Sequence, residues 1–426
     1  MNEFIPLSVP NLKGNELKYV TDAIEQEWVS TAGGYVNRLE DDMKSYLGVS
    51  GAVACQSGTA GIHLALMVSG INENHEVIVP SLTFIAAVNP VRYVGASPVF
   101  MDCDDFLCMD MDKLEEFCSI ECDFIHNNLI NKRTGKQVKA VIVVHVFGNM
   151  ADMAKALNIS KKYNLMLIED ATEALGTYYC PEYSPCRCGD IPLKEGEKDL
   201  PPSLRGEARS AGGSPPDGLN KKFAGTIGDI GVYSFNGNKI ITTGGGGMLV
   251  SNLPELTQKA KYLSTQAKND EINFIHDEVG YNYRMTNVQA ALGVAQLEQL
   301  EDFIKVKTAN YDRYKSAIDK ISGLRILPFC DSIRANYWFY SLFIEDPQKH
   351  KKDDIIEYLA KNNIQSRPVW GLINEQKPYV NCQAYKIEKT RYYFDRIVNI
   401  PCSTNLIIEQ VDCIIAKIRE FVGDGL

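Results

Sequence analysis

Residues 233–247 have the sequence YSFNGNKIITTGGGG, which places a lysine, Lys239, between two predicted strands and beside a run of four glycines. The apolar residues of 229–235 predict a strand that ends shortly before Lys239, and residues 248–250 predict a second, short strand. Strand ends are where the active sites of α/β folds lie. The stretch therefore favours an α/β fold with a lysine in its active site.

A lysine amine in this setting can form a Schiff base with a carbonyl cofactor, and pyridoxal phosphate is the commonest such partner. The alternative is an ordinary lysine next to an ordinary turn, because motif matches of this length carry false positives. The choice depends on other motifs in the chain.

The segment that follows a predicted strand at 49–55 is a candidate phosphate site. Ser57, Gly58, Thr59 and Ala60 form a turn of small residues, and an apolar helix begins directly after them. Backbone N–H groups at a helix start, together with the two hydroxyls, can bind a phosphate. The same residues also make a good helix N-cap, so this motif alone is weak.

Two further strand ends carry candidate ligand contacts. Asp170 ends a predicted strand at 164–170, where a carboxylate could keep a pyridine nitrogen protonated or could simply cap a helix. Phe84 follows a predicted strand at 76–80, where it could stack on a planar ring or pack in the core. We expect His63 to be a core residue, whereas His145 is equally open to a ligand role and a structural hydrogen bond.

Composition and charge exclude several classes of protein. The chain has 426 residues, 45% of them hydrophobic, and a formal net charge of −10. The acidic balance argues against nucleic-acid binding and against a basic membrane-surface role. The first residues do not resemble a signal peptide, no apolar run is long enough to span a membrane, and the 12 cysteines are scattered. We therefore expect a cytoplasmic protein with reduced thiols.

The chain divides into two predicted domains. Residues 1–264 form a large cofactor-binding domain, and residues 265–426 supply a long connecting helix at 287–321 and a small C-terminal α/β domain. Residues 180–222 hold seven of the 18 prolines, which predicts a surface insertion. Cys180, Cys186 and Cys188 lack a fourth ligand at short spacing there, so no metal site is expected. A helix at 14–27 should carry Leu17, Val20 and Ile24 on one face.

Taken in order, these motifs resemble the DegT/StrS-type nucleotide-sugar aminotransferases, which are pyridoxal phosphate enzymes of fold type I. The resemblance rests on six segments and spans nearly the whole chain outside 180–222. These segments are Ser57–Ala60, Pro80–Phe84, Glu169–Glu173, Gly228–Gly231, Ser234–Gly247 and Gly280–Ala291. The sequence FNGNK and the four glycines are most similar to the branch that makes 4-amino sugars for legionaminic acid or bacillosamine. A glycine, Gly245, stands where the family more often has glutamate.

The resemblance implies a fold-type I α/β architecture with a mostly parallel central sheet, and a role for each matching residue. Lys239 would bind the cofactor covalently and move the proton, and Asp170 would pair with the pyridine nitrogen. Phe84 would stack on the ring, beside which Glu173 would lie. The phosphate would be held by Gly58, Thr59, Ala60 and Ser234, and by Asn282 of a partner subunit, which implies a homodimer with shared active sites.

The implied reaction is transfer of an amino group from L-glutamate to C4 of a nucleotide-linked 4-keto-6-deoxy sugar, in bacterial surface-glycan biosynthesis. A UDP-linked N-acetylhexosamine is the first choice of acceptor, and dTDP- or GDP-linked sugars or amination at C3 are alternatives. A sugar dehydratase and a non-catalytic regulator on the same scaffold are the rival classes. Lys239 argues against both, because a related dehydratase subgroup lacks the lysine and a binding scaffold does not need it. Trp28, Ser30, Arg367 and Trp370 are candidates for the substrate pocket or for structural roles.

Overall fold

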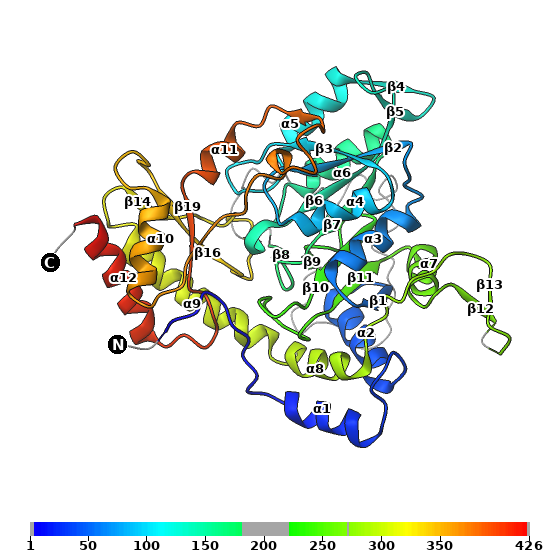
Figure 1. Ribbon diagram of the computed structural model, residues 1–426, viewed down its shortest axis with the longest axis horizontal. Helices are drawn as coiled ribbons and strands as arrows, with labels where there is room; N and C mark the ends of the chain where they lie inside the picture. Colours follow the sequence, from blue (N-terminus) through cyan, green and yellow to red (C-terminus); the bar gives the residue numbers. More distant parts are fainter. Residues whose placement is uncertain (1–3, 181–220, 271, 424–426) are drawn as a thin grey trace.

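The computed structural model describes residues 4–180, 221–270 and 272–423. Most of the predicted insertion, including Cys186 and Cys188, lies outside these residues. A large sheet with surrounding helices occupies one side of the molecule, and a smaller sheet with helices α9, α10 and α12 occupies the other (Figure 1). In the part of the chain that is described, no helix is both long and apolar enough to cross a membrane.

The large sheet has the order β1-β11-β10-β7-β6-β2-β3-β18. The pairs from β10 to β18 are parallel, whereas β11 is antiparallel to both of its neighbours. Its strands are β1 (Gly51–Cys55), β2 (His75–Pro80), β3 (Ser97–Met101), β6 (Gln137–Val144), β7 (Met166–Asp170), β10 (Ile230–Ser234), β11 (Gly247–Ser251) and β18 (Ala384–Tyr385), and the hairpin β4 (Cys122–Ile125) and β5 (Asn128–Asn131) joins the edge of β6. The prediction of an α/β fold with a mostly parallel central sheet is confirmed.

Strand β6 shows why this sheet forms the core. Ile142 and Val144 pack into one hydrophobic cluster, while Val141 and Val143 pack into another. Alternate side chains of a strand point to opposite faces, so both faces of β6 are covered, as its unbroken apolar run predicts. The helices around this sheet are α1 (Glu16–Glu25), α2 (Gly34–Leu47), α3 (Gly58–Val68), α4 (Asn89–Tyr93), α5 (Met111–Glu116), α6 (Met153–Tyr163), α7 (Pro254–Ser264) and α8 (Asn287–Leu297).

The smaller sheet has the order β14-β16-β19-β17 and follows a long helix, α9. There are two further small sheets among the described residues: a three-stranded sheet with the order β15-β8-β9, and the hairpin β12-β13. The elements are α9 (Leu300–Ile318), β14 (Leu324–Ile326), β16 (Tyr340–Ile344), α10 (Lys352–Lys361), β17 (Arg367–Pro368), α11 (Lys389–Phe394), β19 (Ile397–Ile400), α12 (Ile408–Val422), β8 (Tyr178–Tyr179), β9 (Lys222–Phe223), β15 (Ile333–Arg334), β12 (Lys268–Asp270) and β13 (Ile275–His276).

One sequence-based expectation about helices is wrong in detail, and a second helix leaves its predicted apolar face uncovered. The single helix predicted at 287–321 is two helices, α8 and α9, which separate at residues 298–299. No proline or glycine stands there; instead the Gln299 amide donates to Glu16 of α1 and to the Ala295 carbonyl, a tertiary contact that the sequence does not reveal. On α1, the predicted apolar face is not buried within the chain: Leu17 is 80% and Ile24 is 55% exposed.

Candidate active site

Lys239 lies on the turn that joins β10 to β11, at the carboxyl edge of the parallel strands. Its backbone N–H donates to the Asn236 carbonyl, and the turn closes through the hydrogen bond from Phe235 N–H to the Gly246 carbonyl. A Cβ atom on Gly247 would lie 2.6 Å from the backbone nitrogen of Gly58, so only glycine lets this segment approach the start of α3 so closely. The glycine run thus brings Lys239 and the small-residue turn into one site.

Two carboxylates from the end of β7 lie close to the lysine. The Lys239 Nζ atom is 3.5 Å from Glu173 Oε1, and the lysine side chain is only 11% exposed. Glu173 Oε2 accepts a hydrogen bond from the Phe147 N–H. Burial raises the pKa of the Glu173 carboxyl to about 7, although the neighbouring lysine acts in the opposite direction. This carboxyl can therefore hold or release a proton near neutral pH.

Asp170 is buried at the end of β7 and faces the same site. Thr172 N–H donates to its Oδ1 atom at 3.0 Å. Burial raises the pKa of the Asp170 carboxyl, while the hydrogen bonds from Thr172 and the charges of Lys239 and His145 lower it. A carboxylate buried at the edge of the sheet can accept a hydrogen bond from a cationic N–H of a ligand.

The start of α3 forms the third side of the site. The Ser57 side chain accepts from Ala60 N–H and caps the helix, as its motif allows. Within the described chain, the N–H groups of Gly58 and Thr59 have no acceptor. A Cβ atom on Gly58 would be 3.4 Å from the Ser234 hydroxyl, so Ser234 lies beside these free donors. An anion bound here could accept hydrogen bonds from backbone N–H groups and from a hydroxyl at the same time.

Phe84 and Asn282 are both exposed, at separate borders of the site. Phe84 follows β2 at the same edge of the sheet and is 53% exposed, so its ring is free to contact a ligand. Asn282 lies in a segment that runs along the end of β1, where Gln56 N–H donates to the Tyr283 carbonyl and Cys55 pairs with Arg284. Neither residue contacts Lys239 within one chain.

The structure adds two residues that the sequence did not reveal. The Trp338 ring centroid lies 3.9 Å from Lys239 Nζ, and its Nε1–H donates to the carbonyl of Asn238. Asn336 is fully buried and donates to the carbonyls of Glu173 and Leu175. Both precede β16, about a hundred residues beyond the lysine, and the only sequence signal would have been the rarity of tryptophan, which occurs three times.

The remaining candidates have structural positions. His145 Nε2 is 2.8 Å from Glu169 Oε2, and both side chains are fully buried. Of the two roles open to His145, this contact corresponds to the structural hydrogen bond. His63 is 5% exposed, contacts the Tyr283 hydroxyl and packs among tyrosine rings. The Asn287 side chain and backbone bond the carbonyls of Trp28 and Ser30. Trp370 packs on Phe147, and Arg367 is exposed on β17.

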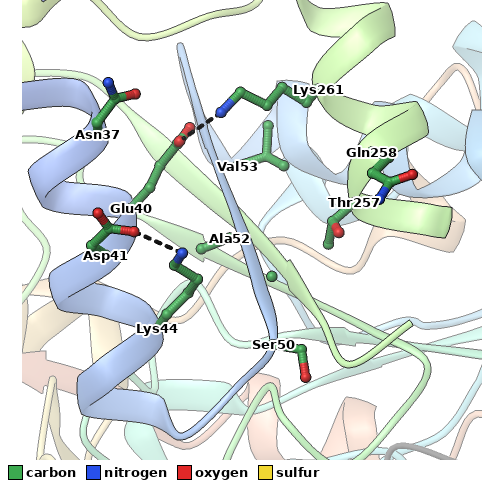
Figure 2. Close-up of a pocket in the computed structure, with 11 residues that line it drawn as sticks. Asn37, Glu40, Asp41, Lys44, Ser50, Ala52, Val53, Thr257, Gln258 and Lys261 are labelled. Carbon is green, nitrogen blue, oxygen red and sulfur yellow. Dashed lines mark hydrogen bonds and ion pairs between the residues drawn. The ribbon is translucent and has the colours of Figure 1, made fainter. Parts of the chain in front are cut away.

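A separate hollow of about 370 Å³ lies between α2, β1 and α7 (Figure 2). Glu40 and Lys261 form an ion pair across it, and Asp41 and Lys44 form another. Glu40 also accepts from Ala54 N–H and Arg284, so its carboxylate is fully used in fixing β1 and the segment that carries Asn282. None of the predicted site residues lines this hollow, which we therefore do not assign to the chemistry.

The residues at the carboxyl edge fit a phosphorylated pyridine aldehyde. The site combines a largely buried lysine amine, a buried carboxylate, and N–H groups without an acceptor at a helix start. These match an aldehyde, a protonated ring nitrogen and a phosphate respectively. In chemical terms the donor set is complete for a covalently held pyridoxal phosphate.

Comparison with known proteins bears on the whole chain. The model of the DegT/DnrJ/EryC1/StrS aminotransferase family matches residues 10–419. The chain is 32% identical over 415 residues to EpsN of Bacillus subtilis strain 168, which its name describes as a candidate pyridoxal phosphate-dependent aminotransferase, covering 96% of this chain and 94% of EpsN. It is also 32% identical to GDP-perosamine synthase of Escherichia coli O157:H7, covering 99% of this chain and 100% of that protein.

Solved structures show the same fold. The aminotransferase TlmJ from Streptoalloteichus hindustanus superposes with a TM-score of 0.80 at 22% identity, covering 99% of this chain and 100% of TlmJ. At this identity the likeness concerns the fold, which is that of the fold-type I enzymes expected from the sequence.

Proposed function

Because the chain belongs to the DegT/DnrJ/EryC1/StrS aminotransferase family, we propose that it transfers an amino group from L-glutamate to C4 of a nucleotide-linked 4-keto-6-deoxy sugar. It is an aminotransferase that uses pyridoxal phosphate and acts on a nucleotide sugar. The observation that carries the proposal is the position of the Lys239 amine, 3.5 Å from Glu173 in a site that also contains Asp170 and the start of α3.

Pyridoxal phosphate supplies an aldehyde that carries the amino group and a ring that withdraws electrons. Lys239 would hold the cofactor covalently, and its free amine would take a proton from the α-carbon of glutamate and return one at C4 of the sugar. The Asp170 carboxylate would keep the ring nitrogen protonated. Glu173 would lie beside the ring, and its carboxylate, 3.5 Å from Lys239 Nζ, would keep the lysine amine within reach.

We assign the phosphate to the N–H groups of Gly58 and Thr59 and to the Ser234 hydroxyl. Ala60 lies next to them, and its backbone N–H donates to Ser57. We assign ring stacking to Phe84. The exposure of Phe84 supports this, because a ring used for stacking must keep one face free for the ligand.

We further propose a homodimer in which Asn282 reaches the phosphate in the partner's site. Support comes from apolar side chains on the outside of the chain: Leu17 and Ile24 on α1, and Phe274 and Val279 near Asn282, which are 68% and 82% exposed. Exposed apolar side chains that are covered by a partner are typical of interaction surfaces. The Asn282→Ala variant should retain the fold but lose cofactor during dialysis; retention equal to that of the unaltered protein would contradict the shared site. Reduced cysteines and a nucleotide-linked substrate support a cytoplasmic location.

The identity of the nucleotide has two candidates. We place UDP first, on the resemblance of the segment Asn236–Lys239 and the glycine run to the UDP-sugar branch. GDP is the second candidate, because the relative from Escherichia coli with full coverage has a name that specifies a GDP-linked product.

The test is competition among UDP-, GDP- and dTDP-linked 4-keto-6-deoxy sugars with L-glutamate, with the product identified by NMR. Selectivity is the ratio of the kcat/KM values. The highest value for a UDP-linked sugar, aminated at C4, supports the first choice. A dTDP-linked 3-keto sugar that turns over faster than all of them would reject the C4 assignment but not the aminotransferase. Failure of amino transfer to every keto sugar would reject the proposed substrate class.

A further inference from the structure

Trp338 contacts the lysine segment at two points. Its ring centroid lies 3.9 Å from the Lys239 Nζ atom, and its Nε1–H donates to the carbonyl of Asn238 at 2.8 Å. Asn238 directly precedes the lysine, and the Ser8 hydroxyl donates to the same carbonyl. The indole therefore fixes the backbone before the lysine and the end of the lysine side chain at once.

Trp338 is itself held in place by buried polar groups. The backbone N–H of Trp338 donates to Asn336 Oδ1 at 3.0 Å, and its backbone carbonyl accepts from Lys307 Nζ at 3.0 Å. Between Asn336 and Trp338, Tyr337 has a φ of 52°, a left-handed conformation that a bulky residue keeps only when its surroundings impose it. The position of the indole is thus determined by its neighbours.

The same network holds the residue whose carboxylate contacts the amine. Asn336 donates to the backbone carbonyl of Glu173, and Thr177 joins the Asn336 N–H to the Gly148 carbonyl, beside Phe147. The amine therefore contacts two groups, the Glu173 carboxylate and the indole, whose residues are both hydrogen-bonded to Asn336.

This geometry matters when the lysine is not bonded to the cofactor. A free lysine side chain has many rotamers and would move away from the reacting atoms. An ammonium group over an aromatic face is attracted to the ring, and this attraction is strongest for tryptophan. Holding a reacting group in place is a large part of enzymatic rate acceleration.

We propose that Trp338 is a positioning residue for Lys239, which keeps the free amine beside Glu173 and within reach of the reacting atoms. The inference rests on the proposed function, because it takes Lys239 as the lysine that binds the cofactor.

The test compares the variants Trp338→Phe, which keeps a ring face but loses the Nε1–H donor, and Trp338→Leu, which loses both. Trp370→Leu is the matched control: it removes a tryptophan from the same aromatic cluster, packed on Phe147, with no contact to Lys239 or Asn238 among the described residues. Melting temperatures report packing in all three.

The first readout needs no substrate. Cofactor-free protein is mixed with pyridoxal phosphate, and the rate of the absorbance change that marks its bond to Lys239 is measured. We expect Trp338→Leu to slow this step about tenfold and Trp338→Phe to slow it less, because misplaced reacting groups lose rate. The second readout is the reaction with saturating L-glutamate, in which kcat should fall while the KM for glutamate changes less than about threefold.

The outcomes separate this proposal from the proposed function. If Lys239→Ala leaves the absorbance change intact, the assignment of the site has failed and Trp338 falls with it. If Lys239→Ala abolishes the change, wild-type rates in both Trp338 variants, or equal slowing in Trp370→Leu, would overturn the positioning role alone. Slowing in Trp338→Leu with a wild-type rate in Trp338→Phe would overturn the part assigned to the Nε1–H contact. Trp338→Phe keeps a ring in the core, so the test survives poor folding of the leucine variant.

Discussion

His145 Nε2 and Glu169 Oε2 are 2.8 Å apart, and both side chains are fully buried. Glu169 also accepts hydrogen bonds from the N–H groups of Gly225 and Ile227, so this carboxylate serves the fold. The next residue, Asp170, points to the opposite face of β7 and into the site. Two adjacent carboxylates at one strand end thus have separate tasks.

We therefore expect opposite effects from the two substitutions. Glu169→Ala would leave at least two buried N–H groups unpaired and should cost on the order of 3 kcal/mol of stability, at about 1–3 kcal/mol for each group. Asp170→Asn is nearly isosteric and should melt close to the wild-type temperature but lose most transaminase activity. Thermal unfolding and a glutamate-dependent assay check both. An Asp170→Asn protein with full activity would contradict the assignment of Asp170.

The division of labour between Glu169 and Asp170 shows how far sequence reasoning reaches. The apolar run before them predicted β7, and the resemblance assigned Asp170 to the site. Which of the two faces the site depends on where α3 and the turn of Lys239 pack, and those contacts join residues far apart in the chain. Trp338 and Asn336 escaped prediction for the same reason, since no local pattern connects the start of β16 to Lys239.

Lys239→Ala should abolish the near-visible absorbance that bound pyridoxal phosphate acquires through its bond to the lysine. Lys239 is the lysine that the structure places beside Glu173 and Trp338. Lys307→Met is the control: Lys307 is also buried, but it donates to the carbonyls of Trp338 and Cys402 and should affect stability first. Absorbance spectra of the purified, cofactor-loaded proteins measure this. An unchanged spectrum in Lys239→Ala would contradict the assignment of Lys239 as the lysine that binds the cofactor.

The exposed face of α1 should carry part of the dimer interface. The double variant Leu17→Glu, Ile24→Glu introduces charges at two positions whose apolar side chains are 80% and 55% exposed in the single protomer. Desolvating charges is costly, so the dimer should dissociate at micromolar concentration. The control is Phe124→Glu, Ile125→Glu on β4, which is also exposed. Light scattering after size-exclusion chromatography measures the mass, and a dimer that persists unweakened would place the interface elsewhere.

The insertion should be replaceable by a short linker. Residues 181–220 lie outside the described chain, but their flanks pair as β8 and β9, with Tyr178 opposite Phe223. Because the two ends are already adjacent, a glycine-serine linker closes the gap at a small cost in entropy. We expect a melting temperature within a few degrees of wild type. Phe223→Ala, which removes a ring packed on Tyr46 and Tyr178, should lower it clearly. Insoluble protein after replacement would show that the segment supports the fold.

Glu173 should make the stability of the cofactor-free protein depend on pH. Burial raises the pKa of its carboxyl from 4.5 to about 7 in the folded chain. Below pH 4.5 both states hold the proton and folding carries no penalty. As the pH rises to about 7 the unfolded state releases the proton first, so stability falls, and the full loss above that pH is on the order of 3 kcal/mol.

Glu173→Gln cannot titrate and escapes this loss. We expect the variant to melt at a higher temperature than the wild type at pH 8, and the advantage to shrink steadily as the pH is lowered from 7 to 5. Glu345→Gln, at an exposed position after β16, should show no such trend. Calorimetry of the cofactor-free proteins measures the difference at each pH. A difference that stays constant from pH 5 to 8 would mean that Glu173 is not the group that takes up the proton beside Lys239.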